Sequence, residues 1–185
     1  MEKDIRENIE LLFKNYPELT NIGYKTQQSI FQKFKRKVRK KIPDWYDKFL
    51  TEYPIAELKI GIPFNFGWES LKDKNQSELP YMNTEFNSIE DIELIAKEEF
   101  PGFELIKQNY ICIAENTNKD GDGFYINSKE QNPKIIYIYH DCGNNASELI
   151  KNGQVICNSF SEFLNVIKPH EFADKWLAEN EHLWK

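Results

Sequence analysis

Several features are missing from this sequence. No apolar run approaches the ~20 residues that a membrane-spanning helix requires. The first residues, Met-Glu-Lys-Asp-Ile-Arg-Glu, lack the basic start and apolar core of a signal peptide. Cysteine is scarce: Cys112, Cys142 and Cys157 are odd in number and lie in or beside apolar runs, as buried reduced thiols do. Together these absences predict a cytoplasmic protein with no membrane partner.

What the chain does contain is enough for one well-packed domain. A chain of 185 residues buries roughly 70% of the surface that it exposes when unfolded. The hydrophobic fraction of 40% and the aromatic fraction of 14% exclude wholesale disorder. The chain has no internal repeat and no low-complexity linker. We therefore expect a single domain over residues 1–185, and we expect a monomer.

Charge is unevenly distributed along the chain. Residues 1–43 carry eleven basic and five acidic side chains, and the rest carries thirteen basic and twenty-five acidic ones, so +6 and -12 give the net charge of -6. An acidic body attracts a basic partner and repels nucleic acid phosphates, although acidity also serves simple solubility. The basic run from Lys33 to Lys41 invites a nucleic-acid hypothesis, but a solvated helix face is the favoured interpretation, with docking on the protein's own acidic side as one form of it.

Hydrophobic periodicity and turn residues predict the order of the elements. Ser88 with Asp91, and Ser159 with Glu162, have the spacing of capping boxes at helix starts. The Gly61-Ile-Pro sequence argues for an edge strand. The predicted helices cover residues 1–16, about 26–41, 43 onward, 88–100, 159–168 and the segment after 169, whereas 57–66 and 81–86 are predicted to be extended and 68–77 a loop.

The stretch from Tyr110 to Ile167 is the most informative part of the sequence. Three β runs are separated by turn residues, and a short strand then leads directly into a capped helix. This order predicts an antiparallel meander packed on a helix. No position in the stretch carries a nucleophile–base arrangement, which favours a binding surface over an enzyme.

Two short motifs contain atoms that could bind a metal. Asn118, Asp120 and Asp122 are spaced like the first ligands of a calcium loop, but the twelfth position is Lys129 and strands flank the segment. A tight turn between strands is the favoured interpretation. His140-Asp141-Cys142 has no companion metal-binding motif, so we interpret His140 as a satisfied core histidine at a strand end. No metal and no cofactor are expected.

The residues also carry a family resemblance. Ile42-Pro-Asp-Trp-Tyr-Asp-Lys-Phe-Leu50 is similar to the helix that opens domains of the SUKH superfamily, the Smi/Knr-related group. The Gly-Asp-Gly turn, a strand ending near His140-Asp141, and Asn158-Ser-Phe-Ser-Glu-Phe-Leu164 follow in the same order. The resemblance covers roughly residues 25–168, leaving a helical extension over 1–24 and a C-terminal helix over 169–185. The chain departs from the pattern after the first helix, where Thr51-Glu-Tyr-Pro-Ile-Ala replaces the usual Asn-Gly-Gly.

This resemblance implies an α+β fold with a mostly antiparallel central sheet flanked by helices. It also implies an immunity protein that sterically neutralises a cognate polymorphic toxin domain, often a nuclease, without catalytic residues. Hot spots for a basic toxin should combine carboxylates with exposed aromatics. The residues expected to bind the partner are Glu115, Asp120, Asp122, Tyr125 and Asp141, followed by Trp68 and Glu69.

Two other functions remain open from the sequence. An intracellular regulatory or scaffold module would bind an endogenous partner through the same kind of surface. A metal-dependent hydrolase would need Asp120, Asp122 and His140 to converge on one ion.

Overall fold

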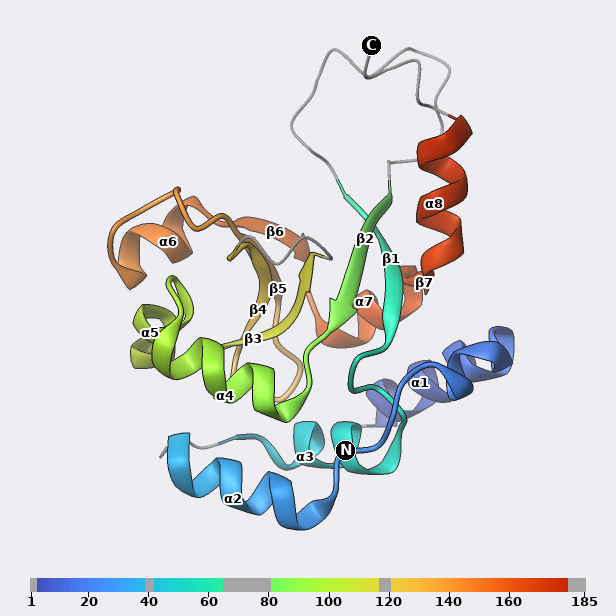
Figure 1. Ribbon diagram of the computed structural model, residues 1–185, viewed down its shortest axis with the longest axis horizontal. Coiled ribbons are helices and arrows are strands. Elements are labelled where there is room, and N and C mark those ends of the chain that lie inside the picture. The colour runs from blue at the N-terminus through green and yellow to red at the C-terminus, as the bar shows by residue number, and fades with distance from the viewer. Residues whose placement is uncertain (1–2, 39–41, 65–80, 117–120, 180–185) are drawn as a thin grey trace.

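The structure is a computed structural model that describes residues 3–38, 42–64, 81–116 and 121–179 (Figure 1). The helices are α1 (Lys3–Asn15), η1 (Pro17–Asn21), α2 (Gln28–Val38), α3 (Asp44–Glu52), α4 (Ile89–Glu98), α5 (Gly102–Leu105), η3 (Ile106–Gln108), α6 (Ala146–Asn152), α7 (Phe160–Val166) and α8 (His170–Glu179). The strands are β1 (Lys59–Pro63), β2 (Tyr81–Phe86), β3 (Tyr110–Asn116), β4 (Gly123–Asn127), β5 (Ile135–Ile138), β6 (Gln154–Cys157) and β7 (Lys168–Pro169). The fold is α+β, as predicted.

Within the described residues the strands form one seven-stranded sheet in the order β6-β5-β4-β3-β2-β1-β7. All neighbouring strands are antiparallel, and β3, β4 and β5 are the predicted meander. The expectation that β1 is an edge strand is wrong. The chain returns after α7 and adds β7, which pairs Ile60 with Pro169 and Gly61 with Lys168, so a two-residue strand occupies the edge instead.

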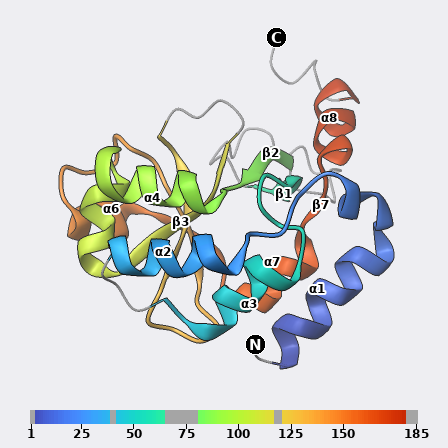
Figure 2. The same cartoon turned by 60° about the horizontal axis from the view of Figure 1, so that its bottom comes forward.

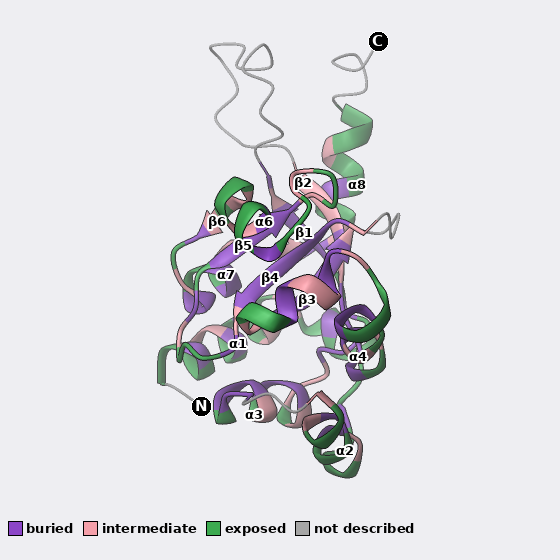
Figure 3. Cartoon of the chain, turned by 90° about the vertical axis from the view of Figure 1, so that its left-hand side faces the viewer, coloured by how far each residue is buried: buried purple, intermediate pink, exposed green. Residues whose placement is uncertain are grey.

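Helices cover both faces of the sheet, so two apolar clusters form. Phe124 and Ile126 of β4 belong to the larger cluster, together with apolar residues of α1, α3 and α7. Tyr125, between them in the strand, points to the opposite face and belongs to a smaller cluster with residues of α5 and α6. The central strands are accordingly buried, while the outer faces of the helices are exposed (Figure 3).

The predicted caps form with one difference. The Ser88 hydroxyl accepts from the Asp91 amide, and the Asp91 carboxylate accepts from the Ser88 amide, which completes a capping box at α4. At α7 the Ser159 hydroxyl accepts from the Glu162 amide at 3.1 Å. The Glu162 carboxylate accepts from the amide of Asn158 at 2.8 Å, one residue earlier than the motif requires.

The N-terminal helix packs on the body of the domain. Ile5, Ile9 and Leu12 are buried in the larger cluster. The side-chain amide of Asn8 donates to the backbone carbonyl of Ser161 in α7 at 2.8 Å. Figure 2 shows α1 beside α7, and α2 running next to α4. None of the helices in the described ranges is long and apolar enough to cross a membrane.

Candidate binding surface

The predicted partner-binding residues occupy different environments. Glu115 and Asp122, near the ends of β3 and β4, are 7% and 9% exposed. Tyr125 is buried, and Asp141 is exposed. The remaining predictions, Asp120, Trp68 and Glu69, lie outside the described residues. The structure therefore places Asp141 on the exposed surface and Glu115 in the wall of a hollow beside α4.

Tyr125 is placed in the core rather than on a surface. Its side chain is 1% exposed and lies on β4 opposite Cys112 of β3. Burial, and then the neighbouring Cys112, raise the pKa of Tyr125 well above its ordinary value. The expectation of an exposed aromatic at this position does not hold, because α5 and α6 cover this face of the sheet.

Asp122 and His140 form a pair across the meander. The Asp122 Oδ1 atom accepts from the His140 amide at 2.8 Å and lies 2.9 Å from the His140 Nδ1 atom. The His140 side chain is 49% exposed, so the interpretation as a core histidine is wrong. Strand β5 ends at Ile138, which places His140 in the following turn at the surface.

The part of the chain that the structure describes contains no group of three or more His, Cys, Asp or Glu side chains that could hold a metal ion. Asn118 and Asp120 of the calcium-like turn lie outside the described ranges. Cys112 and Cys142 do not form a disulfide. Among the described residues around this turn, Asp122 and His140 form the hydrogen-bonded pair.

The basic run of α2 is partly neutralised by the protein itself. Lys35 forms an ion pair of 3.1 Å with Asp47 of α3, and Lys37 forms one of 2.8 Å with Glu93 of α4. These two lysines therefore bind carboxylates of the same chain, which is the docking on the protein's own acidic side chains that the sequence left open. The segment 39–41 lies outside the described residues.

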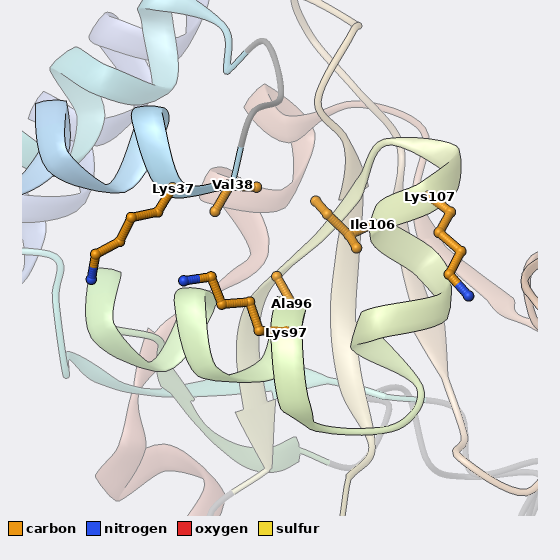
Figure 4. Close-up of a pocket in the computed structure, with 6 residues that line it drawn as sticks. All are labelled: Lys37, Val38, Ala96, Lys97, Ile106 and Lys107. Carbon is orange, nitrogen blue, oxygen red and sulfur yellow. The ribbon is translucent and has the colours of Figure 1, made fainter.

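A hollow of about 260 Å³ lies between α2 and the α4–η3 region (Figure 4). Val38, Ala96 and Ile106 line its apolar part, and Lys37 and Lys97 lie at one end, whereas Lys107 points away. Lys97 donates to the same carboxylate as Lys37, at 2.6 Å. Lys37 and Lys97 are therefore engaged by Glu93, whereas Lys107 pairs with Glu104.

The outward face of α4 is a feature that the sequence reasoning missed. Leu94 is 43% exposed, and it lies between two hollows. One hollow, of about 260 Å³, is lined by Leu94 together with Glu90, Glu98 and the ion-paired group of Lys37, Glu93 and Lys97. The other, of about 120 Å³, is lined by Asp91, Ile95, Glu99 and Glu115 as well as Leu94. The available signal was that Leu94 falls outside the buried stripe of this helix, flanked by glutamates four residues away on either side.

An exposed aromatic lies beside the start of α4. Tyr24 is 43% exposed, and its hydroxyl donates to the Glu57 carboxylate at 3.3 Å. Partial burial, followed by the charges of Glu57 and Glu90, raises the pKa of Tyr24. Glu57 itself has a φ of 59°, in the left-handed region that a residue with a side chain seldom adopts.

The sheet topology and the two helical layers define an α+β domain whose outer helix faces carry the candidate surface. The chain matches the SMI1/KNR4 family (SUKH-1) over residues 26–166 and belongs to that family. Members of this family generally act as immunity proteins in polymorphic toxin systems and are typically non-catalytic. No curated protein and no solved structure matched the chain.

Proposed function

We propose that this protein is an immunity protein that binds and sterically neutralises a basic domain of a cognate polymorphic toxin. The family match over residues 26–166 is the observation that carries this proposal. The strongly acidic balance beyond residue 43 supports the choice of a basic target. Opposite charges would speed the encounter of the two proteins and lower the concentration of free toxin quickly.

The proposed mechanism requires contact and no turnover. An immunity protein of this kind covers the toxin's working surface, so its effect depends on affinity and on the geometry of the complex. Glu115 and Asp141 remain candidate contacts, together with Asp120, Trp68 and Glu69 outside the described residues. Asp122 is a weaker candidate because its Oδ1 atom is occupied by His140.

Co-expression tests this proposal directly. The protein is produced together with the C-terminal domain encoded directly upstream of it, and growth and complex formation are followed. We expect rescue of growth and co-purification of a tight complex. A variant of the toxin domain that lacks activity serves as a control, because it should still bind without affecting growth.

The opposite outcome has a clear meaning. If the upstream domain is toxic and the folded protein neither rescues growth nor binds it, immunity against that domain is excluded. If no toxin-like domain is encoded nearby, the cognate toxin that the proposal requires is missing. A regulatory module that acts on an endogenous protein then becomes the better description.

A further inference from the structure

We propose that the toxin docks on the outward face of α4, with Leu94 at the centre of the contact and cationic side chains of the toxin around it. This inference rests on the proposed function and specifies the surface that performs it. We name this surface the α4 face and define it by its members: Tyr24, Glu57, Glu90, Asp91, Leu94, Glu98, Glu99 and Glu115.

The centre of the α4 face is apolar and accessible. Helix α4 buries Ile92 and Ile95 against the body of the domain, whereas Leu94 is 43% exposed. A single exposed leucine is ordinary on a protein surface. Leu94 differs in its surroundings, because a hollow lies on each side of it. A ridge between two hollows offers a partner both an apolar contact and space for its own side chains.

The rim of the α4 face is negatively charged and available. Glu90 and Glu98 lie one turn before and one turn after Leu94, on the same side of the helix. Together with Glu99, they form no ion pair with any residue in the described ranges. The nearby ammonium groups of Lys37 and Lys97 are both bound to Glu93. Glu90, Glu98 and Glu99 therefore place carboxylates without an ion-pair partner among the described residues around the apolar centre.

The smaller hollow suits the end of an arginine or lysine side chain. Its volume is about 120 Å³, and its walls include Glu99 of the helix end and Glu115 of β3. Glu99 forms no ion pair with a described residue, so a cation that enters the hollow would meet its carboxylate. Charge-assisted hydrogen bonds of that kind are stronger than neutral ones. The occupant that fits is a basic protein surface.

Tyr24 extends the α4 face beyond the start of the helix. Its ring is 43% exposed, and its hydroxyl is held by Glu57 at 3.3 Å. Tyrosine is enriched among the residues that dominate binding energy. The left-handed backbone of Glu57, with φ of 59°, agrees with the tendency of strained residues to occur at functional sites. The α4 face thus combines an aromatic, an aliphatic centre and a carboxylate rim.

The decisive variant is Leu94→Arg, which adds a cation at the centre of the contact. The probe is the purified C-terminal domain encoded directly upstream, and its Kd is measured by titration calorimetry. We expect the Kd to rise by at least about 30-fold, the effect of losing one hot spot. The matched control is Leu11→Arg, the same change at an exposed leucine of α1, which should alter the Kd by less than about twofold. Circular dichroism and thermal melts establish that both variants fold.

A second variant tests the charges without changing the apolar centre. Glu98→Lys combined with Glu99→Lys should slow association by about tenfold at low salt, and the difference from the wild type should shrink in about 0.5 M NaCl. If both the Leu94 and the glutamate variants bind like the wild type, the α4 face is not the docking surface, while the proposed immunity function stands. If the wild type itself does not bind the upstream domain, both proposals are overturned.

Discussion

The Asp122 carboxylate holds His140 at two points, accepting from its backbone amide at 2.8 Å and lying 2.9 Å from its ring Nδ1 atom. Eighteen residues separate the two positions. The contact fastens the segment before β4 to the turn after β5, and it thereby fixes one end of the meander. Asp122, which was predicted to contact a partner, therefore binds a residue of its own chain.

Asp122→Ala should therefore destabilise the fold. The substitution removes a charged acceptor and leaves the His140 amide without its partner, which costs about 1–3 kcal/mol in the free energy of unfolding. Asp141→Ala, at the neighbouring exposed carboxylate, should change this free energy by less than about 0.5 kcal/mol. Urea denaturation of both variants measures the difference. Equal stability of the two would show that the Asp122–His140 contact contributes nothing.

A second prediction concerns the close approach of β3 and β4. A Cβ atom at Gly123 would lie 2.6 Å from the Cys112 sulfur and 3.1 Å from the Ala114 carbonyl oxygen. Gly123→Ala should lower the free energy of unfolding by about 1–3 kcal/mol, the usual cost of overpacking a core.

Cys112→Ala provides the matched test of that cause. Removing the sulfur opens space for the new methyl group, so the double variant should be more stable than the sum of the two single effects predicts. Denaturation of the two single variants and the double variant measures this coupling. Strict additivity would mean that the Ala114 backbone, and not the Cys112 sulfur, limits the position.

Local signals in the sequence predicted much of the fold. The Ser88–Asp91 capping box, the three β runs and the apolar stripe of α7 depend on residues close together in the chain, and each is present. The short helices α5 and α6 were missed. Helix α6 is capped by Asn145, whose side chain accepts from the amides of Ser147 and Glu148, a cap that the sequence contained but that we did not use.

The candidate site was harder to predict because it depends on contacts between distant segments. Alternation of side chains along β4 places Phe124 and Tyr125 on opposite faces of the sheet, but it does not reveal that helices cover both faces. The same limit applies to β1, which was expected at the edge of the sheet. Strand β7, from near the end of the chain, pairs with β1 and occupies the edge instead. The hollow beside Leu94 likewise needs Glu115 of β3 next to α4, a proximity that no local pattern encodes.

A third prediction concerns the thiols. Burial raises the pKa of Cys112 and of Cys142, and it raises the pKa of Cys157 to about 12. Since the thiolate is the reactive form, all three should react with Ellman's reagent more slowly than a free thiol at about pH 8. Cys142 is partly exposed and the other two are buried, so Cys142 should react first, and Cys142→Ser should remove that phase. A fast phase that survives this substitution would contradict the burial of Cys112 and Cys157.

The last prediction is a pH dependence that arises at Glu93. Hydrogen bonds from Lys37 and then Lys97 lower the pKa of this carboxyl below its ordinary value of 4.5. Because the folded pKa is the lower one, the stabilisation is complete above the unfolded pKa and is lost as the pH falls through the folded pKa. The Lys37 and Lys97 side chains are 47% and 40% exposed, so solvent screening limits the contribution to under about 1 kcal/mol.

Urea denaturation between about pH 6 and pH 3, with and without added salt, measures this contribution. Glu93→Gln should flatten the acid side of the stability profile relative to the wild type, and salt should reduce the difference between the two. Glu90→Gln is the matched control, because Glu90 lies on the same helix and forms no ion pair with a described residue. If both variants lose stability with the same slope as the wild type, the two lysines do not hold Glu93 in solution. The anchoring of α2 on α4 would then depend on apolar packing, and the carboxylates of the α4 face would have two more cations beside them.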